Sequence, residues 1–396
     1  MSPEKSTFRS LINTAAVALW ATAALLLLPA VALAGTIKLG AILAVTGPAS
    51  FLGAPEARTL EMLVAETNAR GGINGDKIEL IIKDSGGSPE KAISFARQLI
   101  EEERVFAIIG PSTSGETLKI KKICEQGRTI LLSCAAAEVI VNPVGRYVFK
   151  VAPNDRHAAG KIFQTMQALG ISQIAVLSGN TGFGKAGKAQ LAKLAPTYGI
   201  TIRASEVYDK KATDLSAVIA KLRADQEIQA VVNWSIVPAQ SILAKNMRQA
   251  GWQVPLFQSS GFGSIKYVQA AGAAAEGIIF PASRLLVAEE LAADHPQKAT
   301  LLRYKKSYEA KFKEEASTFG GHTYDAFLLF SEALKQAGPN REKVRTELEN
   351  LQGFAGTAGT FNFSPSDHNG LGEDSFAVLT VKDGAFTFYN ASPAAP

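Results

Sequence analysis

Short apolar runs rich in β-branched residues alternate with longer segments of helical periodicity along most of this chain. The runs TIKLGAIL, KIELIIKD, VFAIIG and TILLSC are bounded by Gly, Pro or Ser, which predicts buried strands. Between them, the spacing of Ala92, Phe95, Ala96, Leu99 and Ile100 predicts an amphipathic helix. A second series, QIAVLSG, TIRASEVY, AVVNWS and PLFQSS, repeats the pattern. We therefore expect an α/β fold with two open, mostly parallel sheets flanked by helices.

The order of these runs predicts two lobes with several crossings between them. The first series ends near Pro153 and the second near Ala282, and the helical run that follows lacks the strands for a third sheet. The last stretch alternates with period two around Asp383 and Gly384, which predicts a hairpin. The predicted lobe 1 comprises 35–153 and 283–356, and lobe 2 comprises 154–282 and 357–396, joined by a multi-crossing hinge near Pro153, Ala282 and Gly356.

The first 34 residues have the order of an export signal. Lys5 and Arg9 precede an almost entirely apolar stretch, and Pro29 precedes a small-residue run that ends at Ala34. This order predicts a signal peptide, residues 1–34, cleaved near Ala34, and export to the periplasm. A membrane anchor from Leu11 to Ala34 is the alternative, because that length just spans a bilayer. No Cys lies near the cleavage site, so no lipid anchor is indicated.

Length and charge favour two domains and a small ligand. About 360 residues remain after cleavage, which exceeds what one core usually organises. The net charge is +5, and the basic residues are scattered without a stripe or interleaved aromatic residues. We therefore expect no nucleic-acid binding, whereas a small anionic ligand fits the charge balance.

Two cysteines raise the question of a disulfide in an oxidising compartment. Cys124 falls near the end of a predicted helix, and Cys134 falls at the far end of the strand that follows. The extended strand separates them by more than the Cα distance that a disulfide allows. We expect two free, mostly buried thiols.

The sequence contains few residue patterns that are typical of enzymes. The histidines show neither HExxH nor cysteine-partnered spacing, and neither a G-x-S-x-G elbow nor a G-K-[ST] loop occurs, so we expect a non-enzyme with no catalytic residues, metal or cofactor. One G-x-G-x-x-G, Gly182 to Gly187, follows the run QIAVLS, and Glu206 lies about twenty residues further on. An NAD-type oxidoreductase is therefore an alternative. The other interpretation is that these glycines close a strand-to-helix turn.

Polar and small residues gather where the predicted strands end, which is where open α/β sheets bind ligands. The long loop after the first strand carries Phe51, and GPSTSGE follows the third. The hydroxyls of Ser112, Thr113 and Ser114 beside free N–H groups at a helix N-terminus can hold a carboxylate. The alternative is an ordinary N-cap.

The next strand ends also suggest a ligand site. Cys134, Ala135, Ala136 and Ala137 are small enough to let a ligand approach the backbone. Phe183, Trp234 and Ser260 occupy the corresponding positions in the second strand series. Each aromatic residue alone is typical of a core, but three on facing loops, namely Phe51, Phe183 and Trp234, indicate an aromatic-lined cleft.

Several motifs together resemble the solute-binding proteins of ABC importers, in the branch of the leucine/isoleucine/valine-binding protein. They are TGPASFLG, NARGGINGDKIELIIKD, GPSTSG, GFG at Phe183, GGHTYDA and FSPSDHNGL, and the resemblance runs from about Thr36 to Asn390. It implies two Rossmann-like lobes that close on a ligand and deliver it to a membrane permease. It also implies that Ser114 holds the ligand carboxylate, that Ala135 and Ala137 supply backbone groups, and that Phe51 and Phe183 flank the ligand.

Two departures from that family pattern bear on the ligand. Amino-acid binders of the family typically have Thr where this chain has Ala137, and an acidic residue near the position of Ser260. A buried ammonium without a counter-charge costs several kcal/mol, so we expect this site to reject amino acids. The chain resembles the members that bind aromatic acids, of the benzoate or phenylpropenoid type. We expect a monomeric periplasmic protein that binds such an acid, with an amino-acid binder of the same family, or a ligand-sensing partner of a membrane receptor, as alternatives.

Overall fold

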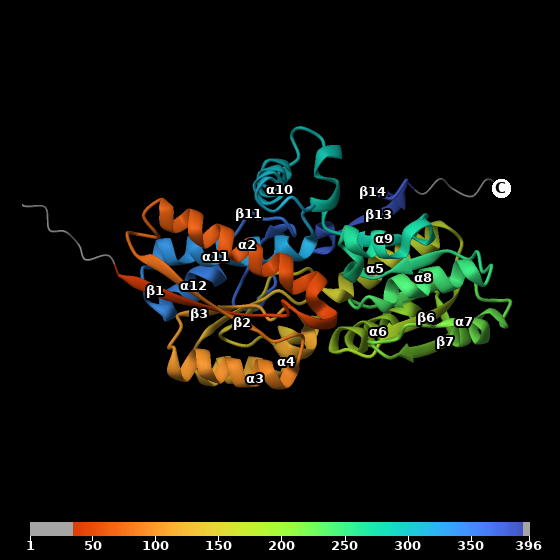
Figure 1. Cartoon of the computed structure of the whole chain (residues 1–396), viewed down its shortest axis with the longest axis horizontal. Helices are drawn as coiled ribbons and strands as arrows, with labels where there is room; N and C mark the ends of the chain where they lie inside the picture. Colours follow the sequence, from red (N-terminus) through yellow and green to blue (C-terminus); the bar gives the residue numbers. More distant parts are fainter. Residues whose placement is uncertain (1–34, 391–396) are drawn as a thin grey trace, which may run out of the picture. The chain divides into compact units, whose positions relative to one another are not determined.

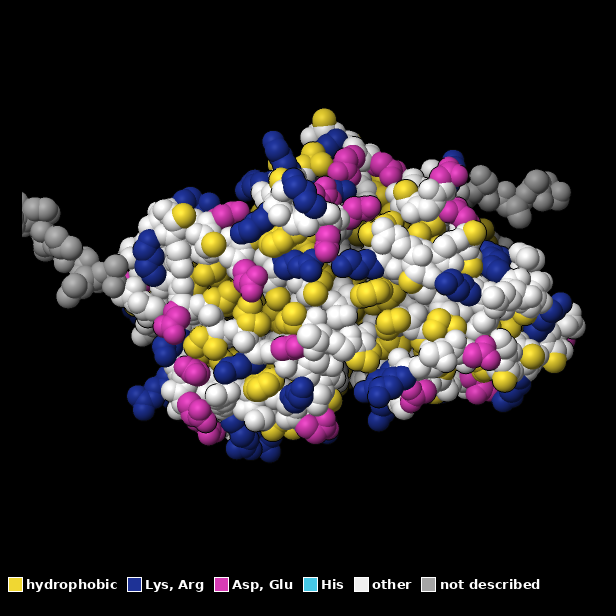
Figure 2. Space-filling view, in the orientation of Figure 1, with side chains coloured by type: hydrophobic (Ala, Val, Ile, Leu, Met, Phe, Trp, Pro, Cys, Tyr) yellow, Lys and Arg dark blue, Asp and Glu magenta, His cyan; other side chains and the backbone are white. Residues whose placement is uncertain are grey.

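The computed structural model describes residues 35–390. The predicted signal peptide, its cleavage site and the alternative membrane anchor lie outside the described residues. Within the described part of the chain, no helix has the length and apolar character needed to cross a membrane. Basic and acidic side chains are interspersed over the face that Figure 2 shows.

The first sheet has five strands, all paired in parallel. Their runs are short and apolar because both faces of the sheet are covered, as in other parallel sheets. The predicted strands TIKLGAIL and KIELIIKD are confirmed with the same bounds. The predicted burial of KIELIIKD is wrong, because it lies at the edge of the sheet and only Ile78 in it is buried. In spatial order the strands are β2 (Lys77–Asp84), β1 (Thr36–Leu43), β3 (Ala107–Ile109), β4 (Ile130–Ser133) and β5 (Val148–Lys150).

The second sheet has seven strands, and a terminal hairpin is added antiparallel to its parallel part. The hairpin turn at Asp383 and Gly384 is confirmed: both residues have positive φ, as a two-residue type I′ turn requires. In spatial order the strands are β14 (Ala385–Phe388), β13 (Ala377–Lys382), β10 (Ile279–Ala282), β9 (Leu256–Gln258), β8 (Ala230–Trp234), β6 (Gln173–Gly179) and β7 (Thr201–Tyr208). Two sheets of this kind confirm the predicted α/β class.

Helices cover both faces of the first sheet (Figure 1). Successive strand residues pack into different clusters: Ile108 joins the side chains of α3 and α4, whereas Ile109 joins those of α2, α10, α11 and α12. This follows from the alternation of side chains along a strand. The helices are α2 (Ser50–Ala69), α3 (Pro89–Arg97), α4 (Ser114–Gln126), α10 (Lys298–Phe312), α11 (Thr318–Ala337) and α12 (Arg341–Asn350).

One continuous core holds the second sheet and its helices. Phe163, Leu191, Ile219, Leu243 and Tyr267, one from each helix, are buried in this core with the strand residues. The helices are α5 (Asp155–Ala168), α6 (Gly182–Leu194), α7 (Ser216–Arg223), α8 (Ala239–Gln249) and α9 (Ile265–Ala271).

The last passage between the two sheets lies later in the chain than the predicted crossing at Gly356. Phe361, Phe363 and Leu371 pack in the core of the first sheet, whereas Phe376 packs in that of the second. The alternation in GTFNFSP belongs to a separate small hairpin, β11 (Phe354–Ala355) with β12 (Thr360–Phe361). We therefore propose a lobe boundary between Leu371 and Phe376; the other predicted lobe boundaries remain predictions.

Both cysteines are free and buried. Cys124 packs in the cluster under α3 and α4, whereas Cys134 packs in the cluster on the opposite face of the first sheet. Burial raises the pKa of the Cys124 thiol to about 12 and that of the Cys134 thiol well above its ordinary value. The sheet therefore separates two unreactive thiols.

Candidate functional site

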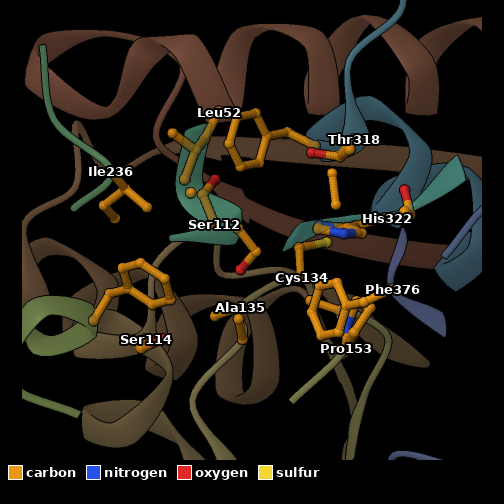
Figure 3. Close-up of a pocket in the computed structure, with 18 residues that line it drawn as sticks. Leu52, Ser112, Ser114, Cys134, Ala135, Pro153, Ile236, Thr318, His322 and Phe376 are labelled. Carbon is orange, nitrogen blue, oxygen red and sulfur yellow. The ribbon is translucent and has the colours of Figure 1, made fainter. Parts of the chain in front are cut away.

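A cavity lies where the ends of strands from both sheets face one another (Figure 3). About 520 Å³ of empty space lies between its lining residues, part of it open to solvent. From the first sheet, Ser112 and Ser114 follow β3, and Cys134, Ala135 and Ala136 follow β4. Three further groups of residues complete the walls: Phe183, Ile236, Ser260 and Gly261 beside the second sheet; Leu52, Thr318, Phe319 and His322 on α2 and α11; and Ala152, Pro153, Ala282, Ser283 and Phe376 on the crossing segments.

Ser114 is placed to donate a hydrogen bond to a ligand. It is the first residue of α4, and its Oγ accepts the N–H of Ala137 at 3.2 Å, which leaves its own O–H available. Thr113 is the N-cap: its Oγ1 accepts the N–H of Glu116 and donates to the carboxylate of that residue. The N-cap interpretation therefore holds for Thr113, while the Ser114 side chain remains in the cavity wall.

Ser112 lies in the same wall but is already engaged. Its Oγ accepts the N–H of Ala44 at 2.9 Å and donates to Oε2 of Glu56. Burial raises the pKa of Glu56 to about 8, although the bond from Ser112 opposes the shift. A carboxyl group with that pKa is mostly protonated at neutral pH. The Ser112 hydroxyl is therefore bonded to a neutral Glu56 side chain.

The aromatic residues are less exposed to the cavity than predicted. Phe183 lines it, but Trp234 is fully buried behind Phe183, with ring centroids 5.7 Å apart. Phe51 packs against Tyr267 at 5.1 Å and lines a different groove, while its neighbour Leu52 lines the cavity. Adjacent helix residues point about 100° apart, which accounts for the exchange of Phe51 for Leu52.

The structure brings five of the nine expected ligand-binding residues together around the cavity. These are Ser114, Cys134, Ala135, Phe183 and Ser260. The other four, which do not line it, are Phe51, Thr113, Ala137 and Trp234. Ala137 still acts through its N–H on Ser114, and Trp234 supports Phe183.

Sequence reasoning missed His322 and Ser283, which both line the cavity. Ser283 follows β10 at a crossing, and His322 lies in the first turns of α11, within the motif GGHTYDA. Burial is the main reason that the pKa of His322 falls to about 3, with the charge of Lys150 as a further cause. His322 is therefore neutral at physiological pH. The histidine in that motif was visible in the sequence, but nothing showed which way it would face.

Charged side chains are missing from the cavity wall. None of its 18 described residues is Asp, Glu, Lys or Arg. Lys150 is buried but does not line the cavity, and its Nζ donates to the carbonyl of Ala152 at 2.5 Å. Burial lowers the pKa of Lys150 to about 7, while Asp155 opposes the shift. The wall itself offers hydroxyls, one neutral imidazole and apolar surface.

The glycine-rich turn after β6 has packing reasons for its glycines. A Cβ on Gly187 would lie 2.0 Å from Nε1 of Trp234, and one on Gly182 would lie 2.5 Å from the Cα of Gly115 on α4. These distances agree with the interpretation that the glycines close a strand-to-helix turn. They also let Trp234 and the backbone of Gly115 approach closely. Among residues 35–390, no group of three or more His, Cys, Asp or Glu side chains is placed to hold a metal ion.

Comparisons with known proteins agree with this architecture. A family model described as periplasmic binding protein matches residues 36–385. An extracellular ligand-binding receptor from Rhodopseudomonas palustris HaA2 is 27% identical, with a TM-score of 0.84 over 89% of this chain and 99% of its own. The branched-chain amino acid transporter substrate binding protein LivJ from Streptococcus pneumoniae, solved with isoleucine, is 25% identical, with a TM-score of 0.77 over 89% and 97%.

A relative identified by sequence similarity belongs to the same group of proteins. The Leu/Ile/Val-binding protein homolog 1 from Brucella suis biovar 1 is 28% identical over 75% of this chain and 77% of its own length. The family model spans both sheets and every crossing segment that lines the cavity. This chain therefore belongs to the periplasmic binding protein family, alongside the Leu/Ile/Val-binding proteins.

Proposed function

We propose that this protein is the substrate-binding component of an ABC importer, exported to the periplasm after cleavage near Ala34. Members of its family are periplasmic proteins that bind small molecules and work with membrane permeases. In this proposal the protein binds its ligand as a monomer, without a cofactor, and delivers it unchanged to a permease. The cavity between the two sheets supports this role, because a ligand there contacts both sheets and the crossing segments.

The proposed ligand is a small monocarboxylate with an apolar, aromatic body. The observation that carries this proposal is the uncharged wall: its 18 described residues offer hydroxyl and backbone donors at one helix N-terminus and mostly apolar surface elsewhere. A carboxylate at Ser114 gains charge-assisted hydrogen bonds and the favourable end of the α4 dipole. A ring against Phe183 gains buried area and aromatic contact.

A branched-chain amino acid is the second candidate. The names of the Brucella and Streptococcus relatives favour it. Its α-ammonium would need a counter-charge, yet Ala137 and Ser260 supply none and Glu56 is mostly protonated. Burying an unpaired ammonium costs several kcal/mol, so this candidate is the weaker one.

Titration calorimetry decides between the two candidates. The panel contains benzoate, 4-hydroxybenzoate, cinnamate, 4-hydroxycinnamate, leucine and isoleucine. We expect at least one aromatic acid to bind and the amino acids to bind poorly or not at all. Tight binding of leucine without a response to any aromatic acid would overturn the aromatic assignment, while the importer role would survive.

The absence of turnover is tested separately. The wall holds no nucleophile paired with a base, since the only described imidazole in it is His322 and the Cys134 thiol is held protonated by burial. We expect the bound acid to be recovered intact after long incubation with the purified protein. Conversion that follows the protein through purification would contradict this.

A further inference from the structure

We propose that His322 and Ser283, two residues of the cavity wall, together bind a neutral hydroxyl group, so that the preferred ligand is a hydroxylated aromatic monocarboxylate. The inference rests on the proposed function and goes further, because it assigns a second polar group to the ligand. It starts from two polar side chains that neither the carboxylate site nor the aromatic contact uses.

Both side chains are buried in the cavity wall and carry unused polar atoms. Ser283 is 3% exposed and His322 is 8% exposed, and both line the cavity. Neither Oγ of Ser283 nor Nδ1 of His322 has a hydrogen-bond partner among residues 35–390. Buried polar atoms are nearly always paired in folded proteins, so two such atoms in one cavity indicate a partner that enters from outside.

His322 lies away from the carboxylate site. Ser114 and His322 point into the cavity from opposite sides of the view in Figure 3, with Cys134 and Ala135 between them. Ser114 belongs to α4, which begins after β3, whereas His322 belongs to α11 and Ser283 to a crossing segment. A ligand that reaches both ends therefore needs an apolar body between two polar groups.

The unpaired atoms of His322 and Ser283 determine which ligand group can bind there. Burial keeps the His322 ring neutral at physiological pH, because it lowers the pKa of the ring to about 3. Nδ1 has no hydrogen-bond partner, and in a neutral imidazole it is a donor or an acceptor according to the tautomer. The Ser283 hydroxyl can donate or accept. A phenolic hydroxyl matches both atoms in either tautomer, because it also can donate and accept.

Charged groups fit this end poorly. A second carboxylate would find no cationic partner, because His322 does not ionise at physiological pH. An ammonium would find no carboxylate among the described residues of the wall. Lys150 does not line the cavity, and its amino group is bonded to the carbonyl of Ala152. A neutral hydroxyl is the group that both free atoms can pair.

Calorimetry on matched ligand pairs tests the proposal in the intact protein. The pairs are benzoate with 4-hydroxybenzoate and cinnamate with 4-hydroxycinnamate. We expect the hydroxylated member of at least one pair to bind at least about tenfold more tightly, because a site built for a hydroxyl discriminates against the analogue that lacks it. Terephthalate, which replaces the hydroxyl with a carboxylate, should bind more weakly than benzoate.

Two variants localise the effect. Ser283→Ala and His322→Leu should each reduce the preference for the hydroxylated acid several-fold and change the affinity for the unsubstituted acid much less. The matched control is Ser216→Ala, an exposed serine on α7 that does not line the cavity, and it should preserve the preference. Thermal melting verifies that each variant is folded; the wild-type pairs remain decisive if one is not.

The outcomes separate this proposal from the one it rests on. Aromatic acids that bind equally well with and without the hydroxyl would overturn the hydroxyl site and leave the aromatic assignment standing. Binding of leucine without any response to an aromatic acid would overturn both. A hydroxyl preference that persists in Ser283→Ala and in His322→Leu would also overturn the site.

Discussion

Ser114 joins the ligand site to the backbone that supports it, because its Oγ accepts the N–H of Ala137 while its O–H faces the cavity. Ser114→Ala removes the donor to the ligand carboxylate, so we expect calorimetry to show weaker binding of the aromatic acid by about 1–3 kcal/mol. The matched control is Ser88→Ala, which removes a hydroxyl at the start of α3, outside the cavity. Unchanged affinity in Ser114→Ala would place the carboxylate elsewhere.

Glu56 makes the stability of the protein depend on pH. Its folded-state pKa of about 8, raised mainly by burial and further by Glu116, compares with 4.5 for an exposed carboxyl. Between these values the folded state keeps a proton that the unfolded state has lost, so stability falls as the pH rises through this window. The glutamine in Glu56→Gln cannot ionise. The melting temperature of this variant minus that of the wild type should therefore increase from pH 5 to pH 8.

The control for Glu56 lies on the same helix. Glu61 is exposed on α2, and Glu61→Gln should leave the slope of melting temperature against pH as it is in the wild type. If the curves of Glu56→Gln and the wild type run parallel across the window, Glu56 is ionised in the folded protein. The Ser112 hydroxyl would then face a charged carboxylate, and binding of an anionic ligand beside it would be disfavoured.

Among the elements, α11 packs on the first sheet and holds the small β11–β12 hairpin through hydrogen bonds to Asp325. Asp325 is buried and accepts the N–H groups of Thr357 and Ala358 at 2.6 and 2.8 Å. Asp325→Ala leaves both donors without a partner, so we expect urea unfolding to show a loss of about 2–4 kcal/mol. Glu332→Ala, at a partly exposed carboxyl of α11 bonded to Gln336, should cost far less. Equal losses would show that Asp325 has no special role.

The sequence predicted elements better than it predicted side-chain directions. β1 could be predicted directly, because a buried parallel strand is a short apolar run between turn residues. The bounds of β2 were also predicted, but its place at the exposed edge of the sheet was not. Period two identifies a strand but not the partner it pairs with, so the sequence could not show that Phe361 belongs to a small hairpin of its own.

Within the site, Phe51 and Trp234 show the same limit. An aromatic residue at a strand end has the same pattern whether it faces a cavity or packs behind its wall, as Trp234 does against Phe183. Phe51 and Leu52 are adjacent on one helix, so only the orientation of α2 decides which of them lines the cavity. His322 required the folded chain for a similar reason, because α11 contributes to the cavity only after it packs beside α2.

For the whole molecule, we expect the two lobes to close on the ligand about the crossing segments. Ala152, Pro153, Ala282, Ser283 and Phe376 all lie on these segments and line the cavity. A bound ligand therefore contacts both lobes and the hinge together, and hinge closure is the usual response of such an arrangement. Small-angle scattering should show a smaller radius of gyration when 4-hydroxybenzoate saturates the protein.

A close contact between the two lobes identifies a residue on which we expect closure to depend. At the N-termini of α4 and α6, a Cβ on Gly182 would lie 2.5 Å from the Cα and 2.7 Å from the N of Gly115. Both are backbone atoms, which cannot move aside as a flexible side chain can. Gly182→Ala should therefore disfavour the closed form by about 1–3 kcal/mol. We expect weaker ligand binding and less compaction in scattering, with little change in the melting temperature of the free protein.

Gly115, the other glycine of this contact, provides a matched control, because a methyl group fits there. A Cβ on Gly115 would lie 3.5 Å from the N and 3.6 Å from the Cα of Gly182, which is ordinary van der Waals contact. Gly115→Ala should therefore bind and compact as the wild type does, although it changes the same interface by the same methyl group. If both variants bind as the wild type does, the ligand is held without this contact. If both lose affinity equally, the effect comes from the helix N-termini rather than from closure.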